Sequence, residues 1–79
     1  MIIGIPKEIM QGEARVAATP ETVEKFSKAG ITILVESGAG IKSHYYDEQY
    51  ESKGAELITD PEELYRRADL ILKVKEPLF

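Results

Sequence analysis

The chain has 79 residues, enough for one small domain, and a domain of this size buries only about 60% of the surface of its unfolded chain. Its 10 Lys and Arg against 14 Asp and Glu give a formal net charge of −4, which argues against a surface that binds nucleic acid or an anionic membrane. The absence of cysteine excludes disulfides and thiolate–metal sites, and no apolar run approaches the roughly 20 residues of a spanning helix. No signal peptide is visible either, so we expect a cytoplasmic protein.

The first half of the sequence predicts a strand, a helix and a second strand. Residues 2–5 form a short apolar run that stops at Pro6, as expected of a strand buried on both faces. Thr19-Pro20-Glu21 is typical of a helix start, with a capping side chain, a first-turn proline and an acid near the positive end of the dipole. Gly30 predicts the end of that helix. The β-branched run at residues 31–35 predicts the second strand.

The second half repeats this alternation with weaker signals. Residues 47–53 predict a brief helix closed by Gly54, and residues 55–58 a third strand. Asp60 is expected to cap a helix that runs to about Arg67, with Glu63 reaching back to complete the cap. Residues 70–74 predict a fourth strand that Pro77 stops.

The predicted order is βαβαβαβ, and its short connections favour a parallel sheet with helices on both faces. The fold class is therefore α/β, a doubly wound sheet of the Rossmann-like or flavodoxin-like kind. Residues 1–79 form one unit without an internal linker. Because the sequence stops directly after a strand of buried type, we interpret it as the incomplete N-terminal part of a larger domain.

The connection between residues 6 and 18 is unusually long for a compact βα unit, which favours a functional role. It carries Arg15, whose planar guanidinium suits a bidentate grip on a carboxylate or phosphate. Lys75 follows the last predicted strand. In a parallel sheet both residues belong to the carboxyl edge, where open α/β sheets bind ligands. The alternatives are a surface arginine paired with Glu13, and lysines at 73 and 75 that are simply exposed.

Other candidate sites are weaker. Ser37-Gly38-Ala39-Gly40 lacks the third glycine of a dinucleotide fingerprint and follows the second strand, so we interpret it as a tight turn. Glu36 stands where such folds place a ribose-binding acid, yet no glycine-rich turn follows the first strand, and we expect this chain alone to bind no cofactor. His44 is the only histidine and is interpreted as a loop or interface residue, so no metal site and no catalytic residue are predicted.

Four motifs together match a known family. GIPKE from Gly4, the E-x-R-V-A-x-T-P run from Glu13, VESGAG from Val35 and ADLILKVKEP from Ala68 resemble the N-terminal domain shared by alanine dehydrogenase and the alpha subunit of nicotinamide nucleotide transhydrogenase. The resemblance covers nearly the whole chain. If the chain comes from a dehydrogenase, the resemblance implies that Arg15 and Lys75 hold the carboxylate of pyruvate or alanine.

The resemblance also implies what lies elsewhere in such proteins, namely the catalytic histidine and aspartate and the NAD- or NADP-binding domain. The implied activity is the reversible oxidation of L-alanine to pyruvate and ammonia by a homo-oligomer, without nucleic-acid or membrane contact by this segment. Two alternatives stay open: a transhydrogenase alpha subunit, which exchanges hydride between two nicotinamide nucleotides, and a non-catalytic interaction module.

Overall fold

The computed structural model describes residues 1–7, 18–41 and 44–73. Within these ranges the helices and strands alternate from end to end. They are β1 (Ile2–Ile5), α1 (Pro20–Lys28), β2 (Thr32–Glu36), α2 (Asp47–Ser52), β3 (Glu56–Ile58), α3 (Pro61–Arg67) and β4 (Leu70–Ile71). Every predicted element is present, and the boundaries differ by one residue for the second and third strands and for the end of α2. The fourth strand ends at Ile71, earlier than predicted, and residue 74 lies outside the described ranges.

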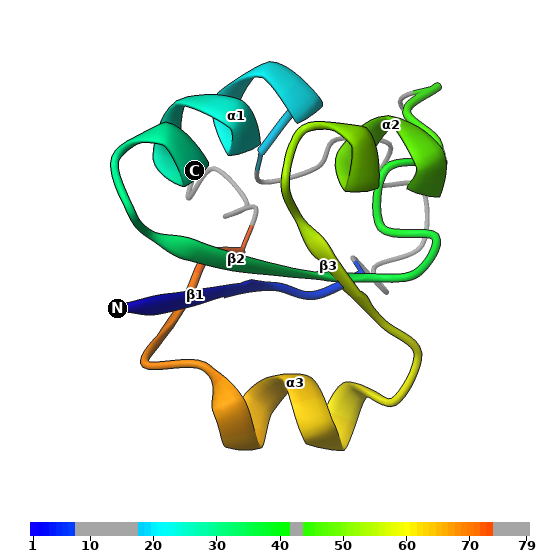
Figure 1. Cartoon of the computed structure of the whole chain (residues 1–79). Coiled ribbons are helices and arrows are strands. Elements are labelled where there is room, and N and C mark those ends of the chain that lie inside the picture. The colour runs from blue at the N-terminus through cyan, green and yellow to red at the C-terminus, as the bar shows by residue number, and fades with distance from the viewer. Residues whose placement is uncertain (8–17, 42–43, 74–79) are drawn as a thin grey trace, which may run out of the picture.

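The four strands form one parallel sheet in the order β3-β2-β1-β4. α1 and α2 cover one face of this sheet, and α3 covers the other (Figure 1). β1 lies between β2 and β4, and its residue Ile3 is in register with Ile33 on one side and Leu70 on the other. The doubly wound α/β architecture predicted from the sequence is therefore confirmed.

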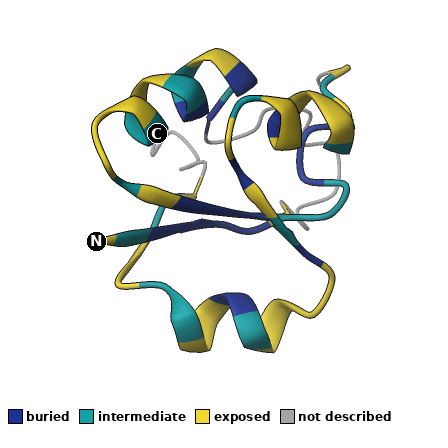
Figure 2. Ribbon diagram, in the orientation of Figure 1, coloured by how far each residue is buried: buried dark blue, intermediate teal, exposed yellow. Residues whose placement is uncertain are grey.

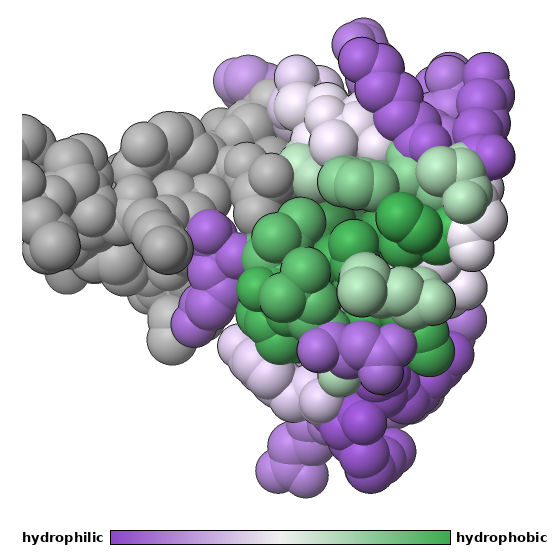
Figure 3. Space-filling model, turned by 90° about the vertical axis from the view of Figure 1, so that its left-hand side faces the viewer, coloured by the Kyte–Doolittle hydropathy of each residue, from purple (hydrophilic) through white to green (hydrophobic). Residues whose placement is uncertain are grey.

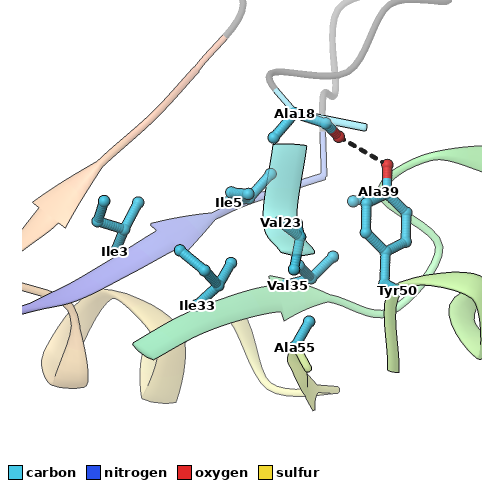
Figure 4. Packing of buried hydrophobic residues seen from close by; sticks show 9 residues of the cluster. All are labelled: Ile3, Ile5, Ala18, Val23, Ile33, Val35, Ala39, Tyr50 and Ala55. Atoms are coloured by element: carbon cyan, nitrogen blue, oxygen red, sulfur yellow. Dashed lines mark hydrogen bonds between the residues drawn. The ribbon is translucent and has the colours of Figure 1, made fainter. Parts of the chain in front are cut away.

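Buried apolar residues form a separate cluster on each face of the sheet. Figure 2 marks buried positions along the strands and on the helices of both faces. The larger cluster lies under α1 and α2, where Val23 and Tyr50 are fully buried (Figure 4). The smaller cluster lies under α3 and consists of Leu34, Ile58 and Leu64. Strands that contribute to both clusters are buried on both faces, which is why their sequences are continuously apolar rather than alternating.

α1 begins and ends where its local sequence signals place it. The side chain of Thr19 accepts a hydrogen bond from the backbone N–H of Thr22, and Pro20 occupies the first turn, where its missing N–H costs nothing. Gly30 follows with φ +86°, the left-handed conformation that closes a helix at little cost only for glycine. Glu24 and Lys28, one turn apart on this helix, form an ion pair at 3.8 Å.

α3 starts as predicted but uses its acids differently. Asp60 accepts a hydrogen bond from the backbone N–H of Glu62. Glu63 was expected to reach back to this cap, and this prediction is wrong, because its carboxylate instead accepts from Arg67 one turn later. Arg67 also donates two hydrogen bonds to Glu56 on β3, and these bonds lower the pKa of that carboxyl. The guanidinium thus joins α3 to the strand before it.

β4 is an edge strand whose apolar residues are incompletely covered. Leu70 is 46% exposed, and Ile71 is half-buried. On the side where the N-terminus lies, apolar side chains gather in the middle of the surface (Figure 3). Among the described residues, no helix has the length and apolar character needed to cross a bilayer.

Candidate functional site

The strand order creates a topological switch point between β1 and β4. From β1 the chain moves outward to β2 and then to β3, and it returns through α3 to pair β4 with the opposite side of β1. The helix that follows β1 in the chain, α1, and the helix that precedes β4, α3, lie on opposite faces of the sheet. Open α/β sheets bind ligands in the crevice at such a point.

Arg15 and Lys75, the predicted substrate-binding residues, both lie outside the described residues. The structure does place the strands that lead to them, because Lys7 follows β1 and Lys73 follows β4 at the same edge of the sheet. Lys73 is exposed and lies beyond the end of its strand. The predicted common edge is therefore confirmed for the strands, while the two side chains stay a prediction.

Two hydrogen bonds fix the described residues on either side of segment 8–17. The backbone N–H of Lys7 donates to the carboxylate of Glu36 at 2.8 Å. The hydroxyl of Tyr50 donates to the backbone carbonyl of Ala18 at 2.8 Å, in the buried interior (Figure 4). Glu36 ends β2 and Tyr50 lies on α2, so both acceptor and donor come from the β2–α2 unit.

The glycine turn after β2 is held by Asp47 at the start of α2. One carboxylate oxygen of Asp47 accepts from the backbone N–H of Gly38 at 2.9 Å, and the other accepts from the hydroxyl of Ser37. A phosphate would need these donors free, and here a carboxylate already occupies them. The turn prediction is confirmed. Glu36 is likewise engaged with Lys7.

Tyr50 is the buried centre of this region. A Cβ on Gly40 would lie 2.6 Å from the Tyr50 hydroxyl oxygen, so only glycine lets the backbone approach the ring so closely. Tyr45 packs edge-on against the same ring, with the centroids 6.4 Å apart. Burial, with a smaller contribution from Tyr45, raises the pKa of Tyr50 to about 12. The phenol therefore remains a hydrogen-bond donor throughout the physiological range.

We expect ionisation of the Tyr50 phenol to destabilise the fold at alkaline pH. Its pKa is raised on folding, so its contribution to stability is complete below pH 10 and is lost as pH rises toward 12. Titration of the phenolate by ultraviolet absorbance should show a group ionising near pH 12 that is missing from Tyr50→Phe. A Tyr50→Phe titration curve identical to that of the wild type would contradict this assignment.

Sequence reasoning did not single out Tyr50. The signal that could have found it is that tyrosine is the only apolar residue in the helical sequence DEQYES, so it alone can face the sheet. His44 lies in the turn before α2 with a positive φ of 66° and is exposed, consistent with the predicted loop role. Among residues 1–7, 18–41 and 44–73, no group of acids and histidine is arranged to bind a metal ion.

Comparison with known proteins identifies the family of this chain. The family model described as "Alanine dehydrogenase/PNT, N-terminal domain" matches residues 4–78, and the chain belongs to this family.

The two relatives compared in sequence are both named alanine dehydrogenase. The chain is 51% identical to alanine dehydrogenase of Bacillus subtilis and 49% identical to that of Methanococcus maripaludis, in each case over 99% of this chain. It spans only 20% and 21% of those two proteins, about a fifth of their length.

Solved structures of both branches of the family share the fold. An L-alanine dehydrogenase superposes with a TM-score of 0.90 at 38% identity, over 99% of this chain and 21% of that one. A transhydrogenase from Sinorhizobium meliloti superposes with a TM-score of 0.83 at 40% identity, over 99% of this chain and 23% of that one.

Proposed function

We propose that this chain is the substrate-side N-terminal part of an NAD-dependent alanine dehydrogenase, which interconverts L-alanine with pyruvate and ammonia. The observation that carries the proposal is the identity of about one half with alanine dehydrogenases over nearly the whole chain. The switch point between β1 and β4 supports it, because the strands that lead to Arg15 and Lys75 are neighbours there.

The role of the chain in this reaction is to bind and orient the substrate carboxylate. The guanidinium of Arg15 and the ammonium of Lys75 would neutralise the carboxylate and hold the substrate α-carbon in one orientation. The nicotinamide supplies the hydride chemistry. We assign no residue of this chain a catalytic or nucleotide-binding role, and the bond from Gly38 to Asp47 in the glycine turn supports this assignment.

A transhydrogenase alpha subunit is the second candidate. The solved transhydrogenase is as similar in sequence to this chain as the solved dehydrogenase is, at 40% against 38% identity. The two candidates differ in their second substrate. A full-length protein that carries these 79 residues should oxidise L-alanine with reduction of NAD. Failure to turn over alanine, together with hydride exchange between NADH and an NADP analogue, would establish the second candidate instead.

We expect the 79-residue chain on its own not to bind NAD. The physical reason is the turn after β2, whose donors serve Asp47, and the absence from the sequence of a glycine-rich turn after β1. Isothermal titration calorimetry with NAD and NADP should show no saturable heat. Saturable binding in the micromolar range would contradict the assignment of residues 1–79 to the substrate side.

The cellular setting is part of the same proposal. A sequence without cysteine fits a cytoplasmic enzyme, and the resemblance to alanine dehydrogenase fits a homo-oligomer.

A further inference from the structure

β4 has an open edge on the side away from β1. It is the last strand in the order β3-β2-β1-β4, and among the described strands it pairs with β1 alone. The backbone N–H of Leu72 donates to the carbonyl of Gly4 on β1, at 3.0 Å. Because successive residues of a strand direct their backbone groups to opposite sides, the N–H and carbonyl of Ile71 point away from β1. A strand of another chain can therefore pair with β4 at Ile71.

The apolar side chains of this edge gain burial from such a partner. Leu70 is 46% exposed, and Ile71 and Leu72 are only partly buried. Among the described helices, α1 packs on β2, and α3 packs on β1, β2 and β3, so neither helix is centred over β4. A strand added at the open edge would remove apolar surface from water without displacing a described helix.

The charges that flank β4 indicate what the partner is. Asp69 precedes the strand and Lys73 lies beyond its end, each two residues from Ile71, and both are exposed. In an antiparallel pair of two copies centred on Ile71, each Asp69 lies opposite the Lys73 of the other copy. Leu70 then lies opposite Leu72. A parallel pair in register would set like charges opposite each other, which is destabilising. The sequence DLILK is therefore complementary to itself in the antiparallel direction.

We propose that two copies of this chain associate through β4, which pairs antiparallel with its own copy and joins the two four-stranded sheets into one. Each Ile71 donates its N–H to the Ile71 carbonyl of the other copy. One oxygen of the Asp69 carboxylate accepts from the N–H of Ile2, and the other meets the Lys73 ammonium of the second copy. Both copies contribute the same edge, so the assembly closes at two chains. This inference concerns the 79-residue chain and does not depend on the substrate proposed above.

Analytical ultracentrifugation of the 79-residue chain tests the stoichiometry. The sedimenting mass should rise from one chain to two as the concentration increases from micromolar to millimolar, and it should rise no further. A monomer over the whole range would overturn the proposal. Species larger than two chains would also overturn it, because a twofold interface leaves no second copy of this edge free.

Amide hydrogen exchange followed by NMR locates the contact. The N–H of Ile71 should exchange about 5-fold or more slowly in the dimer, because it gains a hydrogen bond there. The N–H of Leu72 is the internal control, since it is already bonded to Gly4 and its exchange should change less. Equal exchange of Ile71 at low and high protein concentration would show that β4 is not the interface.

Charge reversal tests the register of the two strands. Lys73→Glu sets acids opposite each other twice in the dimer, so the dissociation constant should rise about 10-fold. Lys25→Glu is the matched control, because Lys25 is exposed on α1, and it should dimerise like the wild type. A mixture of Lys73→Glu with Asp69→Lys restores opposite charges at both pairs and should form a mixed dimer tighter than either variant forms alone. Wild-type dimerisation of Lys73→Glu would refute this register.

Leu70→Ser tests the apolar contribution without altering charge. Loss of the leucine from both copies should raise the dissociation constant of the dimer about 10-fold or more. Tyr65→Ser is the matched control, because Tyr65 is exposed to a similar extent, 48%, but lies on α3. Dimerisation of Leu70→Ser at the wild-type dissociation constant would exclude β4 from the interface.

Discussion

Replacement of Arg15 or Lys75 by alanine in the full-length protein should lower kcat/KM for pyruvate and for L-alanine by about 10- to 200-fold. Each substitution removes a charge-assisted hydrogen bond to the substrate carboxylate, and such bonds contribute about 1.5–3 kcal/mol. The affinity for NAD should change little, because the proposed role of Arg15 and Lys75 is confined to the substrate carboxylate. Initial-rate kinetics with each substrate varied separately measure both quantities.

Two cations that the proposal leaves outside the site serve as controls. Arg66 is exposed on α3, and Lys73 is exposed just beyond β4. Arg66→Ala should leave the kinetics unchanged, and Lys73→Ala should cost less than Lys75→Ala. Normal turnover of alanine by a variant that lacks both Arg15 and Lys75 would refute the site assignment.

Replacement of Leu64 by alanine should cost about 2–5 kcal/mol of stability, the range for truncating a fully buried leucine. Leu64 is the only buried residue of α3, and it packs on β1 where Gly4 has no side chain. A Cβ on Gly4 would lie 2.9 Å from a methyl group of Leu64, so the leucine fills that space directly. Leu64 is therefore the main apolar attachment of α3 to the sheet, beside the bonds from Arg67 to Glu56.

Amide hydrogen exchange of the full-length protein measures this effect locally. The backbone amides of α3 and β4 should exchange at least about 30-fold faster in Leu64→Ala, the factor that corresponds to 2 kcal/mol. Tyr65→Ala is the matched control on the same helix, because Tyr65 is 48% exposed and its truncation should alter exchange by a factor of two or less. Equal protection of α3 in Leu64→Ala and the wild type would contradict the assigned role.

Local signals predicted the elements because the interactions that define them are themselves local. Thr19 accepts a hydrogen bond from a backbone N–H three residues later, and Asp60 accepts one from a backbone N–H two residues later. In both helix caps the two partners are therefore close together in the sequence. The strand order is different in kind. The pairing of β1 with β4 joins residues that are 67 positions apart in the sequence. No short-range pattern predicts which edge of β1 pairs with the last strand.

The candidate site was predictable in its location and only partly in its residues. Parallel strands predict a common carboxyl edge from connectivity alone, and the structure has that edge. The roles of Glu36 and Tyr50 could not be read from the sequence, because each depends on a backbone group about 30 residues away. Glu36 stands where related folds place a ribose-binding acid. In the structure its carboxylate accepts a hydrogen bond from the N–H of Lys7, which is a structural role.

The central place of β1 also determines when the sheet can be completed during synthesis. β1 is made before the other three strands and can pair with β2 once residue 36 has been added, but its second edge stays open until Asp69 and β4 emerge. At that point the backbone N–H of Asp69 donates to the carbonyl of Ile2, and its carboxylate accepts from the N–H of the same residue. A nascent chain arrested between residues 36 and 69 therefore carries an apolar strand with one unpaired edge, and chaperones that bind extended apolar segments should recognise that edge until it closes.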